Sequence, residues 1–161
     1  MATVARRRPG GARPNGPLLE RDQIVEEATR LTAEAGLSSV SMRLLGDRLG
    51  VTSMAIYWYL KNRQELVDAI AEQVCSQIVA DPMLPWDEWI RAVALSAHTV
   101  LSAHAGVPDH LLSAAPLPPS VLALSTGGVE RLTEAGVPRG TPVGAPAGLG
   151  TFVAARPPPG A

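Results

Sequence analysis

Residues 50–66 read GVTSMAIYWYLKNRQEL, and they hold an unusual share of the aromatic side chains in the protein. The chain of 161 residues has three Trp, two Tyr and one Phe, and half of these are consecutive at Tyr57, Trp58 and Tyr59. Successive side chains on a helix point about 100° apart, so one buried face cannot take all three. At least one ring is therefore expected to face outward, beside the two cations that follow in the segment.

The residues before this segment predict two helices. Apolar residues recur at helical spacing at Ile24, Ala28 and Leu31, and Gly36 is a suitable C-cap for that helix. Residues 41–50 predict a second, short helix, because a serine can cap its start and a glycine can end it.

A third short helix is predicted over residues 53–59, capped by Thr52 or Ser53, with Ile56 facing inward. The order of helix, turn, short helix, turn and short helix is the helix-turn-helix arrangement. Gly46 lies inside the first helix of the pair, where alanine would favour the helix by about 1 kcal/mol. We therefore expect that its small size permits the close approach of another helix.

The rest of the chain predicts further helices and no strand. A fourth helix is expected from about residue 62 to residue 80, and a fifth is expected to begin at Pro85. A short helix near residues 108–112 and a helix over residues 120–136, interrupted by its Gly-Gly pair, follow. The predicted fold class is all-α, with an N-terminal three-helix helix-turn-helix domain followed by an incomplete helical domain.

Charge is distributed unevenly along the chain. Residues 1–63 hold ten Lys and Arg against six Asp and Glu, whereas the remainder holds four against nine, which gives the net charge of −1. Residues 1–17 carry four arginines and no acid, and they predict a disordered arm. Residues 137–161 hold six prolines, five glycines and no acid, and they predict a disordered tail. A basic end indicates a polyanionic partner.

Several classes of function find no support in the sequence. No Ser/His/Asp set, phosphate loop or paired-carboxylate motif stands out, so we expect neither an enzyme nor a cofactor. His98, His104 and His110 are six residues apart, so they cannot share one face of a helix, and no metal site is expected. The single Cys75 fits a cytoplasmic protein, and no apolar run approaches the ~20 residues that span a membrane.

The second short helix of the pair is the expected DNA-contacting element, because that helix enters the major groove in this arrangement. Hydroxyls and apolar side chains can meet base edges, while a tyrosine hydroxyl can bond a phosphate and its ring can pack on a sugar. One of the three consecutive rings is expected to pack inward. The alternative without a role in DNA binding is an amphipathic helical hairpin with a solvated basic edge. The expected DNA-binding residues are Ser41, Arg43, Thr52, Ser53, Met54, Tyr57, Trp58, Tyr59, Lys61 and Arg63.

The stretch IVEEATRLTAEAGLSSVSMRLLGDRLGVTSMAIYWYLKNRQELVDAI resembles the DNA-binding domain of the TetR family of bacterial transcription regulators. Its second half is similar to the tetracycline-repressor branch, which has Tyr-Trp-His where this chain has Tyr-Trp-Tyr. In this resemblance Arg43 falls at a base-contacting arginine, and Thr52, Ser53 and Met54 hold the specificity positions. The Ser-Met pair replaces the Gln-Pro of that branch, so its operator sequence does not carry over.

The resemblance implies a repressor that binds a double-stranded, palindromic DNA operator as a homodimer and is released by a small-molecule effector of unknown identity. Together with the composition of the two ends, it divides the chain into a disordered arm at residues 1–17, a helix-turn-helix domain at 18–66, a partial effector-binding and dimerisation domain at 67–136, and a disordered tail at 137–161. The effector-binding residues implied by the resemblance are Val93, Ala97, His98, Leu101 and His110.

After Gly136 the family has two or three long helices for which this sequence shows no helical pattern. Our hypothesis for this difference is a truncated or frame-shifted regulator. Two alternative functions stay open. One is a monomeric, truncated DNA-binding fragment without effector control, which would bind mainly through phosphates. The other is a helical interaction module that pairs with intact relatives.

Overall fold

The computed structural model describes residues 19–136, and within this range the chain is helical, as the sequence predicted. The predicted arm at 1–17 and the tail at 137–161, with the truncation hypothesis that rests on it, lie outside the described residues. None of the helices in residues 19–136 is long and apolar enough to cross a bilayer. The elements are α1 (Arg21–Ala35), η1 (Leu37–Ser39, a 3₁₀ turn), α2 (Met42–Leu49), α3 (Ser53–Tyr57), α4 (Arg63–Cys75), α5 (Trp86–Ser102), α6 (Val107–Ser113) and α7 (Pro119–Glu134).

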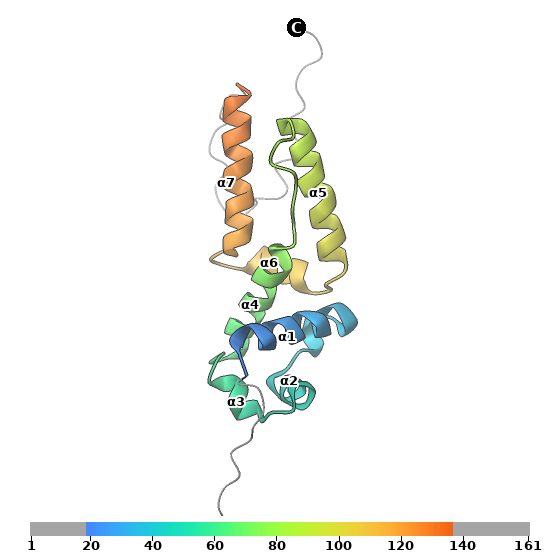
Figure 1. The fold of residues 1–161 in the computed structure, drawn as a ribbon, viewed down its shortest axis with the longest axis vertical. Helices are drawn as coiled ribbons and strands as arrows, with labels where there is room; N and C mark the ends of the chain where they lie inside the picture. Colours follow the sequence, from blue (N-terminus) through green and yellow to red (C-terminus); the bar gives the residue numbers. More distant parts are fainter. Residues whose placement is uncertain (1–18, 137–161) are drawn as a thin grey trace, which may run out of the picture.

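The described part is elongated, with short helices at one end and long helices at the other (Figure 1). Helices α1, α2 and α3 form the lower end in this view, and α5 and α7 stand side by side at the upper end. Helix α4 starts beside α3 and also contacts α5, α6 and α7. We call α1 to α3 with the first half of α4 the head, and α5 to α7 the body.

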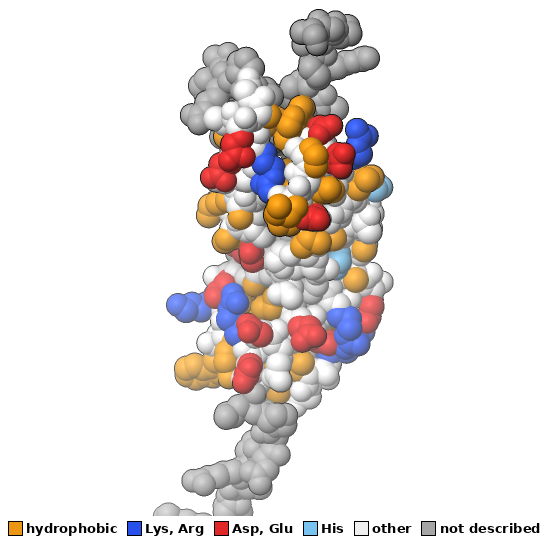
Figure 2. Space-filling view, turned by 45° about the horizontal axis from the view of Figure 1, so that its top comes forward, with side chains coloured by type: hydrophobic (Ala, Val, Ile, Leu, Met, Phe, Trp, Pro, Cys, Tyr) orange, Lys and Arg blue, Asp and Glu red, His pale blue; other side chains and the backbone are white. Residues whose placement is uncertain are grey.

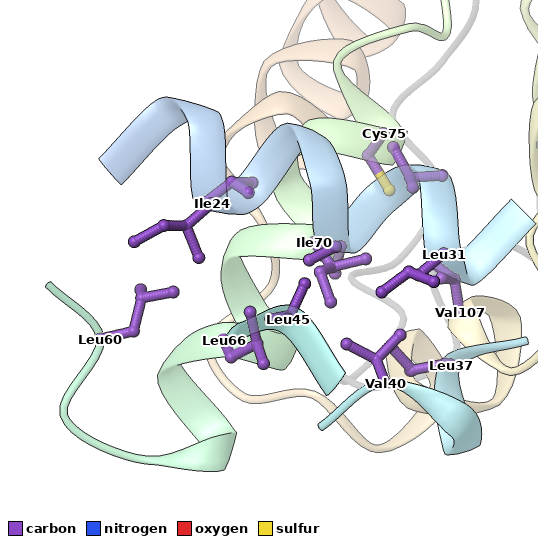
Figure 3. Packing of buried hydrophobic residues seen from close by; sticks show 14 of the residues in the cluster. Ile24, Leu31, Leu37, Val40, Leu45, Leu60, Leu66, Ile70, Cys75 and Val107 are labelled. Carbon is purple, nitrogen blue, oxygen red and sulfur yellow. The ribbon is translucent and has the colours of Figure 1, made fainter. Parts of the chain in front are cut away.

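The core of the head is a cluster of aliphatic side chains from α1, α2 and α4 (Figure 3). Ile24 and Leu31 of α1 lie over Leu45 of α2 and over Leu66 and Ile70 of α4, and all five are almost completely buried. Full burial of one such side chain stabilises the folded state by about 1.5–3 kcal/mol. The apolar side chains that recur at helical spacing in α1 therefore pack on the short helices and hold them in place.

Side-chain and glycine caps set the limits of the two short helices. The hydroxyl of Ser41 accepts a hydrogen bond from the N–H of Leu44 (3.2 Å), and that of Thr52 accepts one from the N–H of Ala55 (3.3 Å). Gly50 ends α2 in a left-handed conformation with a φ of 67°, which favours glycine. The predicted caps at Ser41 and Gly50 are confirmed, and Thr52 is the cap of α3.

Two predicted helices end earlier in the structure than the sequence indicated. Helix α3 ends at Tyr57 rather than at residue 59, because the chain tightens into a turn in which the N–H of Tyr59 donates to the carbonyl of Ile56 (2.9 Å). Helix α4 ends at Cys75 rather than near residue 80. The next N–H groups, of Gln77 and Ile78, donate to carbonyls only three residues earlier, which is a tighter turn than the α-helix.

The predicted interruption of the last helix is wrong, because α7 is continuous through Gly127 and Gly128. A Cβ added at Gly127 would lie 4.0 Å from the ring of Trp89, the buried aromatic side chain of α5. The guanidinium of Arg131 lies 4.4 Å from the centre of the same ring. The contact of Arg131 with Trp89 holds α7 against α5 and offsets the low helix propensity of glycine, while the space at Gly127 would accept a methyl group in ordinary van der Waals contact.

Gly46 is the point of closest approach between α2 and the turn into α3. A Cβ at this position would lie 2.8 Å from the carbonyl oxygen of Val51 and 3.2 Å from the amide nitrogen of Ser53. Both are backbone atoms, which cannot swing aside as the end of a flexible side chain can. The predicted close approach at Gly46 is confirmed, and it fixes the position of α3 against α2.

We expect Gly46→Ala to lower the free energy of unfolding by about 1–3 kcal/mol, the usual cost of forcing extra volume into a packed site. The matched control is Gly127→Ala in α7, where the nearest atom to the added Cβ is the mobile guanidinium of Arg131 at 3.4 Å. The free energy of unfolding of that variant should stay the same or rise by up to about 1 kcal/mol, because alanine favours a helix. Urea unfolding followed by circular dichroism measures both, and an equal response of the two would contradict the assigned contact.

Candidate DNA interface

The three consecutive aromatic residues all lie at the surface of the head. Ile56, just before them, and Leu60, just after them, are completely buried. The exposed fractions of the side chains between are 44% for Tyr57, 83% for Trp58 and 37% for Tyr59. The prediction that one ring packs inward is therefore wrong, because the two aliphatic neighbours already occupy the inward positions.

Met54, Tyr57 and Trp58 form one exposed face, which we call the α3 face. Residues three and four apart lie next to each other on a helix, and Trp58 keeps helical dihedral angles just past the end of α3. Ile56 points to the opposite side, into the core. Met54 is 68% exposed, which fits its place on the outer side. In Figure 2 apolar side chains project at the lower left edge, on the side where α3 lies in Figure 1.

Two of the cations predicted to contact DNA have no ion-pair partner within the described part of the chain. Arg43 in α2 and Lys61 after α3 are exposed, and neither has a carboxylate within ion-pair distance among residues 19–136. Free cations on a surface with exposed aromatic rings suit a polyanionic backbone, whose phosphates accept charge-assisted hydrogen bonds.

Arg63, which the sequence placed with these cations, has a contact inside the head. Its Nη1 donates a hydrogen bond to the carbonyl oxygen of Val40 at 2.6 Å, which joins the first residue of α4 to the segment before α2. The same helix start is capped by Asn62, whose side-chain oxygen accepts from the N–H of Glu65 at 2.8 Å. Arg63 therefore helps to hold the two ends of the α2–α3 unit together, and a role in DNA contact stays a prediction.

The hydroxyl groups of the predicted site differ in what they do. The hydroxyls of Ser41 and Thr52 accept the capping hydrogen bonds of α2 and α3 and thereby define where these helices start. Ser53 is half-buried at the first position of α3. The predicted DNA-binding residues are thus gathered around α3 and the starts of its neighbours, and their contact with DNA stays a prediction.

Sequence reasoning missed an ion-pair network that joins α2 to α1. Arg48 lies 2.9 Å from a carboxylate oxygen of Glu34 and 3.6 Å from one of Glu27, which also pairs with Arg30. The exposed pair of Arg48 and Glu34 contributes about 0–1 kcal/mol. The side chain of Glu27 is only 12% exposed. No local pattern signals the pairing across helices, because the partners are 14 and 21 residues apart in the chain.

The structure separates the predicted effector-binding residues. His98 is exposed on α5, whereas Nε2 of His110 lies 3.0 Å from Oδ1 of Asp68, which links α6 to α4. His110 also borders a hollow of about 420 Å³, lined by the start of α4 and the proline-rich connection before α7. The remaining three are half-buried, packed against the core from α5: Val93, Ala97 and Leu101. Effector binding by these residues stays a prediction.

The described fold and its exposed α3 face define a helix-turn-helix domain. Residues 24–70 match the family described as bacterial regulatory proteins, tetR family. The tetracycline repressor protein class C of Escherichia coli is 39% identical over 54 residues, which cover 34% of this chain and 25% of that protein. Residues 24–70 thus form a domain of the tetR type, and the proteins that the chain resembles are named as repressors or transcriptional regulators.

Two solved structures show the same fold over about three quarters of this chain. BioQ, crystallised with its natural double-stranded DNA operator, has a TM-score of 0.67 at 25% identity, with 74% of each chain covered. The TetR family protein ActR of Streptomyces coelicolor, in complex with (S)-DNPA, has a TM-score of 0.63 at 25% identity, covering 73% of this chain and 59% of that one. The chain spans less than half the length of the tetracycline repressors that it matches.

We expect Arg63→Met to lower the free energy of unfolding by about 1 kcal/mol, because the carbonyl of Val40 loses its charged donor. Lys61→Met is the matched control, since its side chain makes no hydrogen bond within the described part of the chain. Its effect on stability should stay within about 0.5 kcal/mol. Urea unfolding measures the stability of both variants. Equal free energies of unfolding would contradict the internal contact of Arg63.

Proposed function

We propose that this chain is a sequence-specific DNA-binding transcriptional regulator and that it acts as a repressor. The observation that carries the proposal is the α3 face, on which a methionine and two aromatic rings stand exposed beside free cations, in a domain of the TetR family. Exposed side chains of this size have no role in the core of the head. They suit a partner that offers base edges, sugars and phosphates.

The proposed division of labour follows from the chemistry of each side chain. Lys61 contacts a phosphate, and Arg43 contacts a phosphate or pairs with the edge of a guanine, as its position in the resemblance implies. Tyr57 bonds a phosphate through its hydroxyl, and Trp58 packs its ring on a sugar. Tyr59 borders the same contact. Ser53 and Met54, in the first turn of α3, face the base edges, as the first residues of a recognition helix do.

We propose that two copies bind a palindromic operator, one half-site each. Two heads must lie about one helical turn of DNA apart, which requires a dimer contact away from the heads. The body supports this proposal, because exposed apolar side chains stand on its two long helices. These are Leu95 on α5 and Leu122 and Val129 on α7.

Release by a small molecule is the second half of the proposal. ActR, a relative of the same fold, was crystallised with (S)-DNPA, and we extend the ability to bind a small molecule to this chain without its identity. The contacts of α4 offer a route from body to head. Besides the pair of His110 and Asp68, the hydroxyl of Ser120 at the start of α7 donates to Glu72 on α4 at 2.9 Å. A ligand that moves α6 or α7 would therefore tilt α4, which sets the position of α3.

A DNase footprint on the DNA upstream of the coding region tests this function. We expect two protected, symmetry-related half-sites whose centres lie about 10 bp or a multiple of it apart. Diffuse protection that salt erases would instead favour the monomeric fragment, which holds DNA through phosphates alone. Absence of protection together with mixed dimers formed with intact relatives would favour the interaction module.

We expect Trp58→Ala and Lys61→Gln to weaken binding to the protected duplex in different ways. Loss of the indole should lower the affinity about tenfold at every salt concentration, because truncating a tryptophan packed in an interface costs more than about 1 kcal/mol. Loss of the ammonium should reduce the slope of log affinity against log salt by about 1 per bound chain. Leu112→Ala, an exposed apolar change on α6, is the control and should leave both quantities unchanged. Fluorescence anisotropy measures them, and equal behaviour of the three variants would contradict the assigned surface.

A further inference from the structure

Helix α3 lacks every side chain that reads bases by paired hydrogen bonds. Its sequence is SMAIY, with no Arg, Lys, Asn or Gln. The hydroxyl of Ser53 both donates and accepts, so it discriminates little between base pairs. Ala55 is half-buried and Ile56 is fully buried, which leaves Met54 as the exposed apolar side chain in the first turn.

In the major groove, one base carries an apolar mark: the C5 methyl group of thymine. We propose that Met54 reads this methyl group, so that each half-site of the operator has a thymine opposite Met54. The inference rests on the proposed function, since it names what the same surface recognises.

The backbone of Met54 is held in place, as a specificity contact requires. The hydrogen bond from the N–H of Ala55 to the hydroxyl of Thr52 spans Met54 and fixes the first turn of α3. The close approach of Gly46 to Ser53 holds the start of this helix against α2. The buried side chain of Ile56 anchors the next turn. On this fixed backbone the flexible thioether adapts its shape to a methyl group.

The ring of Trp58, four residues further on, flanks Met54 on the α3 face and covers the contact from one side. A side chain that is 68% exposed in the free protein gains most when an apolar group covers it. Removing one methyl group from such a contact costs about 0.8 kcal/mol, which is about a fourfold loss of affinity for each thymine. With two half-sites the loss becomes about fifteenfold.

The test uses the full chain and a short duplex that the chain itself enriches from a random-sequence library. Each thymine in turn is replaced by deoxyuridine, which keeps every hydrogen-bonding group of the base and lacks only the methyl. We expect one position in each half-site at which this replacement weakens binding about fourfold. At this position Met54→Ala should bind the thymine and uracil duplexes equally.

Met83→Ala is the matched control, because Met83 is 86% exposed in the connection between α4 and α5, away from α3. It should keep the full preference for thymine. Equal binding of all thymine and uracil duplexes by the unmodified chain would overturn the inference and leave the DNA-binding function intact. A preference that survives in Met54→Ala would overturn it too, because another side chain would then read the methyl. Failure to enrich any duplex would instead overturn the proposed function itself, and with it this inference.

Discussion

The burial of Ile56 and Leu60 on either side of three aromatic residues is the constraint on which the head depends. Both side chains are completely enclosed, and the chain turns tightly between them. No position between them faces the core, so the rings at 57–59 stand outside. The exposure of these rings is thus a consequence of where the apolar anchors lie, and it needs no strained backbone: none of the non-glycine residues from 19 to 136 has a positive φ.

Helix α4 connects this local constraint to the rest of the molecule. Its inner side chains, such as Leu66 and Ile70, complete the core under α1 and α2, while its outer polar groups bond to α6 and α7. The head and the body also meet at η1, where the N–H of Leu37 donates to the carbonyl of Ala105 at 2.8 Å. A rigid helix with contacts at both ends transmits a displacement, whereas a flexible linker would absorb it. The arrangement is therefore suited to coupling between the two parts.

The sequence was most informative where neighbouring residues decide the structure, as in helix periodicity and capping. The spacing of Ile24, Ala28 and Leu31, the cap at Ser41 and the glycine at position 50 predicted the elements of the head correctly. Two of the errors arose where contacts between distant segments decide the outcome. The continuity of α7 depends on Trp89, and the inner role of Arg63 depends on Val40, a residue 23 positions earlier. Periodicity and caps carry no information about such partners.

The distribution of charge in the head shows what composition alone leaves open. The excess of four cations in the first 63 residues equals the four arginines of residues 1–17, which lie outside the described residues, whereas residues 18–63 hold six basic and six acidic side chains. Within the described part of the head, however, Arg30 and Arg48 pair with glutamates of α1, and Arg63 bonds a backbone carbonyl. Arg21, Arg43 and Lys61 are exposed and have no ion-pair partner among residues 19–136. In the proposed DNA contact, attraction to the backbone therefore comes from few charges of the described head, and discrimination between sequences comes largely from the uncharged side chains of the α3 face.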